Sequence, residues 1–179
     1  MSSITKAYRP WPATLAFVVD VRALDTKISD HYICFIPAEP DFIPGKESQA
    51  AAAALIQKAW NLKKSEITPE TDIHIAFRDC GENFESIHCP HCSAEMEIGH
   101  WQALMDQSYS DENGFTISTI QTPCCGKSTT LNDLCYKWPM GFSRFVLRTV
   151  DPGYEISDHL LIELESAIGS KLRVIHQMY

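Results

Sequence analysis

The stretch RFVLRTVDPGYEISDHLLIELESAIGSKLRVIH, residues 144–176, contains the pattern that decides the fold. Its first residues place apolar or β-branched side chains at every second position, as in a β-strand that buries one face. Ser157 then stands where it can cap a helix, and Gly169 stands where a helix can end with positive φ. The apolar run over residues 172–176 predicts a second strand, so the order is strand, helix, strand.

The same order occurs nearer the N-terminus. The apolar and aromatic run over residues 32–36 predicts a strand that ends at Pro37. An alanine-rich stretch follows a turn and predicts a helix, with Ser48 as its N-cap. Ile73, Ile75 and Phe77 recur at every second position and predict a half-buried strand. The apolar stripe expected on the helix consists of Leu55, Ile56, Ala59 and Trp60.

Two strand–helix–strand halves with short connections predict an α+β fold of two βαβ halves. This would be a split βαβ, ferredoxin-like sandwich, with both helices on one face of an antiparallel or mixed sheet. We expect the core to comprise residues 31–79 and 136–179. Residues 1–30 are an expected N-terminal extension, in which the pattern over 15–22 predicts an additional edge strand.

Residues 80–135 interrupt this pattern and contain six of the seven cysteines. Cys89-Pro90-His91-Cys92 has the C-x-x-C spacing with which a tight turn brings two sulfurs to one metal ion at about 2.3 Å. The pair Cys124-Cys125 follows a strand-like stretch and precedes Gly126, which can adopt positive φ. With a helix between the two turns, residues 80–135 predict an inserted zinc-ribbon or treble-clef-like module. The apolar positions of that helix are Ile98, Trp101, Leu104, Met105 and Tyr109.

The metal site that these pairs predict is one structural Zn²⁺ held by Cys89, Cys92, Cys124 and Cys125. Adjacent cysteines must splay to reach one ion, so another residue could replace one member of the set. The candidates for that replacement are Cys80, Cys135, His88 and His91. Cys34 and Cys135 are otherwise expected to be small buried hydrophobic residues. The deaminase and H-E-x-x-H signatures are absent, and four thiolates close the coordination shell, which favours a structural ion.

The composition is typical of one globular domain with or without a small insertion, at 179 residues, 45% hydrophobic and 21% charged. No apolar run reaches the roughly 18–20 residues that a membrane-spanning helix requires. Residues 13–19 lack the features of a signal peptide. We therefore expect a soluble, cytoplasmic protein with reduced thiols, in which clustered cysteines indicate metal binding.

The net charge of −8 is concentrated in the middle of the chain. No lysine or arginine occurs between Asp79 and Gly126, a segment with eight acidic residues, and elsewhere acidic residues equal the 15 basic ones. Such a segment would repel nucleic acid and attract a basic protein, although acidic residues also simply keep a surface solvated. The expected partner-binding residues are Glu95, Glu97, Asp106, Asp111 and Glu112.

Several short motifs lie along residues 32–179. They are Phe35-Ile36-Pro37-Ala38-Glu39-Pro40, Asp79-Cys80-Gly81-Glu82-Asn83-Phe84, Cys89-Pro90-His91-Cys92, Pro123-Cys124-Cys125-Gly126, Trp138-Pro139-Met140-Gly141-Phe142 and Leu172-Arg173-Val174-Ile175. In these motifs the chain resembles a group of uncharacterised bacterial proteins. The resemblance implies a bacterial origin and a metal site made by the paired cysteines, and it implies no catalytic residues.

Together these features favour a non-enzymatic, zinc-stabilised binding protein. We expect it to be an acidic antagonist of a basic protein, such as an immunity protein that neutralises a nuclease toxin. The alternative is a metal-dependent enzyme or regulator with a site at the turn Asp79–Asn83 near the zinc. There Glu82 would act as the acid–base group beside Cys80 or His74. The Asp, Gly and Asn residues of that segment equally indicate an ordinary turn.

Overall fold

The computed structural model describes residues 31–179, so the strand expected over residues 15–22 lies outside the described residues. The core consists of four strands and two helices, which occur in two strand–helix–strand runs. The first run is β1 (His31–Pro37), α1 (Lys46–Trp60) and β2 (Ile67–Arg78). The second run is β9 (Gly141–Val150), α3 (Asp158–Ile168) and β10 (Leu172–Met178).

The strands of both runs form one mixed sheet with two short strands of the middle of the chain, β4 (Tyr109–Ser110) and β5 (Gly114–Phe115). Its order is β10-β1-β9-β2-β5-β4. β1 pairs antiparallel with β10 on one side, from His31 opposite Met178 to Pro37 opposite Leu172. On its other side β1 pairs antiparallel with β9, which in turn pairs antiparallel with β2. β5 joins β2 in parallel through Ile75 and Gly114. The expected α+β class is therefore confirmed.

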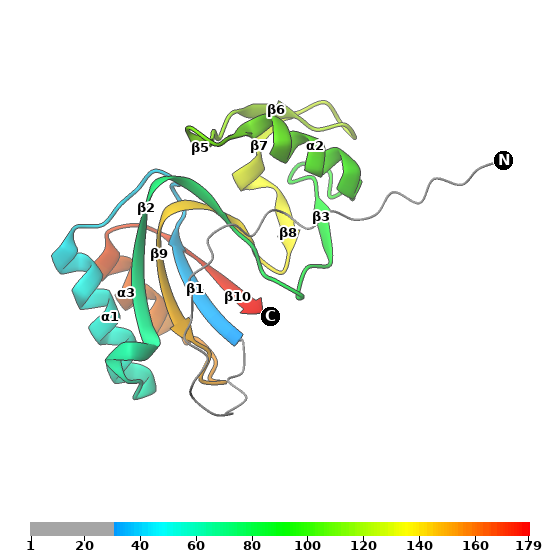
Figure 1. Ribbon diagram of the computed structural model, residues 1–179. Helices are drawn as coiled ribbons and strands as arrows, with labels where there is room; N and C mark the ends of the chain where they lie inside the picture. The colour runs from blue at the N-terminus through cyan, green and yellow to red at the C-terminus, as the bar shows by residue number, and fades with distance from the viewer. Residues whose placement is uncertain (1–30) are drawn as a thin grey trace, which may run out of the picture.

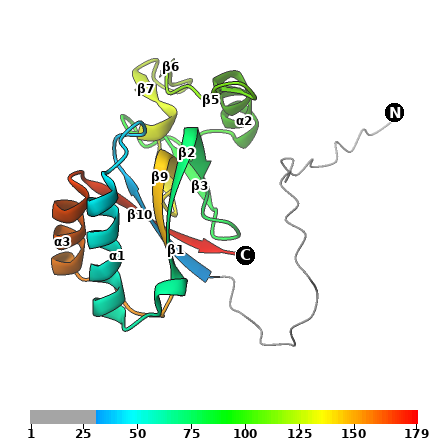
Figure 2. The same cartoon turned by 60° about the vertical axis from the view of Figure 1, so that its left-hand side comes forward.

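Both core helices cover one face of the sheet (Figures 1 and 2). Side chains from the two helices and from alternate strand positions form a continuous apolar cluster there, because successive strand residues point to opposite faces. The Phe35 and Trp60 rings, from β1 and α1, lie 6.2 Å apart within it. The buried members of this cluster are Ile33, Phe35, Ala52, Ile56, Trp60, Ile67, Phe145, Leu147, Leu160, Leu164 and Ile168.

The two core helices begin in different ways. In α3, Ser157 is the N-cap, and its hydroxyl accepts a hydrogen bond from Leu160 N at 3.2 Å, as expected. The expected cap at Ser48 is wrong, because α1 begins at Lys46 and its N-cap is Gly45, without a side-chain cap. The alanine run predicted the helix but not its first residue, since the observed N-cap, Gly45, lies three residues before Ser48.

β2 contains an irregularity that the sequence did not predict. Its register against β9 shifts between Thr71 and Ala76. Ile73 lies inside this shift and is 81% exposed, so the expectation of a half-buried Ile73 is wrong. Extra residues in one strand turn side chains away from the face that strict alternation assigns to them. Ile75, at the end of the shifted segment, and Phe77, beyond it, pack against the apolar cluster of residues 80–135.

Residues 80–137 form short elements, which apart from β4 and β5 lie outside the core sheet, toward the top of Figure 1. These elements are β3 (Ser86–His88), α2 (Ile98–Ser108), β4 (Tyr109–Ser110), β5 (Gly114–Phe115), β6 (Thr119–Gln121), β7 (Ser128–Thr130), the 3-10 turn η2 (Leu131–Asp133) and β8 (Cys135–Lys137). β3 pairs with β8, and β6 pairs with β7. Tyr109, expected in the helix, lies instead in β4.

This middle segment has its own apolar cluster. Met96 and Met105 are buried there against Phe115, and Phe142 of the core strand β9 completes the packing. The Phe115 and Phe142 rings lie 5.1 Å apart in an edge-to-face arrangement. The two turns with paired cysteines are therefore carried by a segment that packs directly on the core. Within residues 31–179, no helix combines the length and apolar character needed to cross a membrane.

Candidate metal centre

The first cysteine pair lies on a tight turn directly after β3. Cys89 N donates to Ala94 O at 2.9 Å, and Ser93 N donates to Cys89 O at 3.0 Å. Ser93 has a φ of 59°, the left-handed conformation that reverses the chain. His91 N also donates to the Cys89 sulfur, at 3.4 Å. The turn thereby brings Cys92 back toward Cys89.

The second pair lies at the tip of the hairpin between β6 and β7. Thr122 N donates to Lys127 O at 3.0 Å, and Gly126 N donates to Thr122 O at 2.8 Å. Gly126 has a φ of 68°, as its position after the pair predicted. Cys124 and Cys125 are both exposed on this tip.

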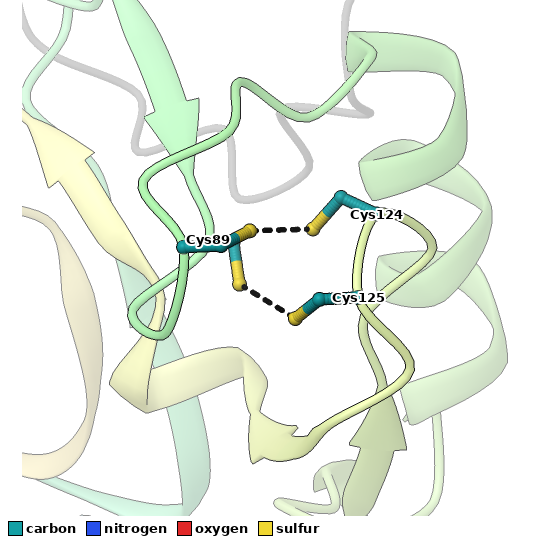
Figure 3. A group of neighbouring side chains, drawn as sticks. Cys89, Cys124 and Cys125 are labelled. Carbon is teal, nitrogen blue, oxygen red and sulfur yellow. Dashed lines mark hydrogen bonds between the residues drawn. The ribbon is translucent and has the colours of Figure 1, made fainter.

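The two turns face each other across the four sulfur atoms (Figure 3). All four Sγ atoms, of Cys89, Cys92, Cys124 and Cys125, lie within 4.8 Å of one another. The Cys89 and Cys125 sulfurs are 3.7 Å apart, and those of Cys92 and Cys124 are 3.3 Å apart. A tetrahedral zinc ion with Zn–S bonds of about 2.3 Å would separate its sulfurs by about 3.8 Å. These four cysteines could therefore hold a metal ion, and their geometry fits a tetrahedral one.

The sulfurs differ in their affinity for a proton. Burial raises the pKa of Cys89, but backbone N–H groups of His91 and Cys92 donate to the sulfur, and the net pKa is lowered to about 6. The hydrogen bond with Cys92 raises the pKa of Cys124 to about 12. Without a cation, thiolates in such close contact repel one another, so one sulfur ionises while its neighbour keeps a proton. A bound cation would take the place of that proton.

The residues that could have replaced one of the four cysteines lie elsewhere. Cys80 is buried in a separate apolar cluster. Cys135 lies on β8 and is exposed, so its expected burial is wrong. Both ring nitrogens of His88 form hydrogen bonds: Nε2 lies 2.9 Å from Ser86 Oγ, and Nδ1 lies 3.1 Å from Ser93 O. The His91 ring reaches across to the backbone of the opposite turn, with Nε2 2.8 Å from the Ser128 carbonyl oxygen.

The segment Asp79–Asn83 forms a turn against the C-terminal strand. Asp79 Oδ1 accepts from Gly81 N at 2.7 Å, and Gly81 has a φ of 62°. Glu82 N donates to Met178 O at 2.8 Å, and Asn83 Nδ2 donates to His176 O at 3.0 Å. The Glu82 backbone and the Asn83 side chain thus bind β10, and Asp79 stabilises the turn itself. His74, the histidine considered with Glu82, lines an open groove of about 570 Å³, whose lining includes neither Glu82 nor a cysteine.

The five acidic residues expected to bind a partner are all exposed: Glu95, Glu97, Asp106, Asp111 and Glu112. None of them forms an ion pair with a basic residue in the part of the chain that the structure describes. Glu85 differs, because it pairs with Lys137 at 3.2 Å and accepts from Trp138 Nε1 at 2.9 Å. The five carboxylates therefore have no basic side chain as a counter-ion within residues 31–179.

One residue of the site was not identified from the sequence. The Thr122 side chain is 1% exposed, and its Oγ1 lies 3.2 Å from the Cys125 sulfur. A signal was present, because Thr122-Pro123-Cys124-Cys125 aligns with Cys89-Pro90-His91-Cys92 when the prolines are matched. This alignment places Thr122 opposite a cysteine.

No family model, curated protein sequence or solved structure matches this chain.

Proposed function

We propose that this chain is a non-enzymatic binding protein in which a structural Zn²⁺ ion stabilises an acidic surface for a basic protein partner. The observation that carries the proposal is a set of five exposed carboxylates without an ion-pair partner within residues 31–179. They lie on residues 80–135, the segment whose two turns the four cysteines bring together. A basic nuclease toxin is one example of such a partner. Its class is defined here by its positive charge.

The chemistry of the four cysteines supports zinc as the metal. Thiolates are soft ligands that select Zn²⁺, Cu⁺ or iron–sulfur clusters over hard cations such as Mg²⁺ and Ca²⁺. Two turns that offer four sulfurs to one point suit a single tetrahedral ion. The ion would connect the turn after β3 to the β6–β7 hairpin. Its binding energy would then contribute directly to the folding of residues 80–135.

The charge distribution supports a basic protein rather than nucleic acid as the partner. Complementary charge accelerates encounter and orients the partner, and exposed carboxylates repel phosphate groups. A fully coordinated thiolate site would add about two negative charges to the same segment. The partner surface would therefore centre on α2 and the turn between β4 and β5, where Asp106, Asp111 and Glu112 lie.

For the core, we propose a ferredoxin-like, split βαβ sandwich. The strand order β10-β1-β9-β2, with antiparallel neighbours throughout, supports this assignment. The placement of α1 and α3 on one face of the sheet supports it as well (Figure 2). In this proposal the core is the scaffold that presents the metal-bearing segment.

The experiment that tests the function is charge reversal. The triple variant Asp106→Lys, Asp111→Lys and Glu112→Lys should retain its metal and its fold, since the three residues are exposed. It should associate more slowly with a basic protein captured from the source cells, by about tenfold or more at low salt, and with a weaker dependence on salt. Stopped-flow fluorescence at several salt concentrations measures both quantities.

The matched control reverses three exposed acidic residues of the core, Glu47→Lys, Glu155→Lys and Glu163→Lys. This control changes the net charge by the same amount but on a different surface, so its association rate should remain near that of the wild type. Equal loss in both variants would mean that net charge, and not this surface, controls association. Tight binding of the wild-type protein to DNA or RNA at physiological salt would contradict the proposal.

A further inference from the structure

The two cysteine turns have the same backbone frame. In each turn, the N–H of the first residue donates to the carbonyl of the sixth: Cys89 to Ala94 at 2.9 Å, and Thr122 to Lys127 at 3.0 Å. In each, the fifth residue donates back to the carbonyl of the first, at 3.0 Å from Ser93 and 2.8 Å from Gly126. The fifth residue has positive φ in both, 59° and 68°. The turns are therefore equivalent, residue by residue.

This equivalence places three of the four cysteines at matching positions. Cys89 is the first residue of its turn, and Cys92 and Cys125 are the fourth residues of theirs. The remaining first position is occupied by Thr122, whose buried hydroxyl lies 3.2 Å from the Cys125 sulfur and donates to Lys127 O at 3.1 Å. A neutral hydroxyl is not among the side-chain donors that hold zinc in proteins. One place in the frame is thus filled by a residue that does not act as a ligand.

Cys124 supplies the fourth sulfur from a different position. It is the third residue of its turn, where the first turn has His91. The His91 ring instead lies within hydrogen-bond distance of the Ser128 carbonyl oxygen of β7, with Nε2 at 2.8 Å. Cys124 is exposed, as Cys92 and Cys125 are, and its sulfur approaches the cluster beside that of Cys92, at 3.3 Å. The frame that fixes the other three sulfurs does not fix this one in the same way.

We propose that Cys124 is an exchangeable ligand and that the site, once Cys124 leaves, accepts a thiol from solution in its place. Cys89, Cys92 and Cys125 retain the ion throughout. In the exchange, the metal–sulfur bond to Cys124 breaks and one to the incoming thiol forms, while the proton of that thiol moves to Cys124. No electron is transferred. This inference rests on the metal centre proposed above and adds a soft-ligand binding position to it.

The experiment uses Co²⁺ in place of Zn²⁺, because its visible spectrum reports how many sulfurs bind it, and 2-mercaptoethanol as the thiol probe. Cys124→Ser should still bind about one Co²⁺ per chain through three sulfurs. Its thiolate-to-Co²⁺ absorption should rise to saturation as the thiol is added. Cys125→Ser removes a ligand that the frame fixes. Its affinity for Co²⁺ should therefore be at least tenfold lower than that of Cys124→Ser.

A compensating variant tests the position of the missing ligand. Thr122→Cys combined with Cys124→Ser places cysteines at the first and fourth residues of both turns. This double variant should bind Co²⁺ with a four-sulfur spectrum that does not change when thiol is added. In the wild-type protein with its metal bound, iodoacetamide should alkylate Cys124 before the other three ligands, as peptide mass spectrometry would show.

Several results would overturn the exchange. The first is that Cys124→Ser loses Co²⁺ as completely as Cys125→Ser does. The second is that the absorption of the double variant changes with added thiol as that of Cys124→Ser does. The third is that iodoacetamide alkylates none of the four cysteines of the wild-type protein before the others. Each leaves the metal centre itself intact. Failure of the wild-type protein to bind Co²⁺ or Zn²⁺ would instead overturn the metal centre, and the exchange with it.

Discussion

Arg173 of β10 holds Asn132 of the middle segment through two hydrogen bonds. Its Nη1 donates to Asn132 Oδ1 at 3.1 Å, and its Nη2 donates to the Asn132 carbonyl oxygen at 2.9 Å. Asn132 Nδ2 donates to Ala38 O at 3.1 Å, and its Oδ1 also accepts from Phe142 N at 3.2 Å. One buried amide thereby connects η2 to β9, β10 and the end of β1.

We predict that Asn132→Ala lowers the free energy of unfolding by about 3 kcal/mol. The substitution leaves the buried Phe142 N–H without an acceptor and the Ala38 carbonyl without its donor, and an unsatisfied group in the interior is costly. Arg173 keeps two acceptors, the carbonyl oxygens of Met140 and of residue 132. Urea denaturation measures the loss. Asn113→Ala, at an exposed asparagine bonded to Ser110, is the matched control and should change stability by about 0.5 kcal/mol or less. Similar losses in the two variants would contradict the structural role of Asn132.

Local sequence patterns predicted the elements of the core but not the contacts between its parts. Phe145 and Leu147 alternate with other residues in the sequence, and both face the helices as alternation requires. The bond from Arg173 to Asn132 joins residues far apart in the chain, and neither residue has a local pattern that identifies its partner. The shift in β2 was missed for the same reason, since its register depends on the position of β9.

The sequence predicted the metal centre as a set of four cysteines but could not choose between them and their alternatives. The C-x-x-C spacing determines a turn by itself, so Cys89 and Cys92 required no information from the rest of the chain. Whether Cys124 or Cys135 completes the set depends on where the β6–β7 hairpin lies relative to β3, which is a tertiary property. Thr122 could have been recognised by aligning the two turns on their prolines.

We predict that protein purified without added metal contains about one zinc ion per chain. Cys89→Ser should lose the metal and destabilise residues 80–135, because the binding energy of a structural ion is also folding energy. Elemental analysis and thermal melting measure the two effects. Cys135→Ser is the control, since Cys135 is exposed and lies outside the group of four, and it should retain the metal. A wild-type protein that folds fully without metal would refute the prediction.

Metal affinity should fall as the pH is lowered. In the metal-free site the pKa of Cys124 is raised to about 12 by its hydrogen bond with Cys92, so at pH 7 a metal ion must displace that proton. The bound state therefore carries fewer protons than the free state, and protons compete with the metal at lower pH. The pKa of Cys89, lowered to about 6, means that this thiolate is also protonated below about pH 6.

Calorimetric titration with Zn²⁺ in buffers of different ionisation enthalpy measures the protons released at each pH. Release should be observed at pH 7, and Cys124→Ser should release fewer protons than the wild type. Binding that is independent of pH between 5 and 8 would show that thiol deprotonation is not coupled to metal binding.

The two candidate caps offer a paired test of the core helices. Ser157→Ala should destabilise the protein by about 1 kcal/mol, because it removes the acceptor for Leu160 N. Ser48→Ala should change stability by only a few tenths of a kcal/mol, since Ser48 lies inside α1, where alanine is a good helix former. Chemical denaturation of both variants measures the difference. A larger loss at Ser48 would restore that residue as a cap.

The position of β1 in the sheet has a consequence for the order in which the protein can fold during its synthesis. β1 is the first described strand to leave the ribosome, yet both strands that pair with it, β9 and β10, are made last. The β6–β7 hairpin and the turn after β3 are synthesised earlier. The four cysteines can therefore come together before β1 has a strand to pair with. Until residues 141–178 emerge, the apolar segment His31–Pro37 has two unpaired edges, which is the condition in which nascent chains aggregate or bind chaperones.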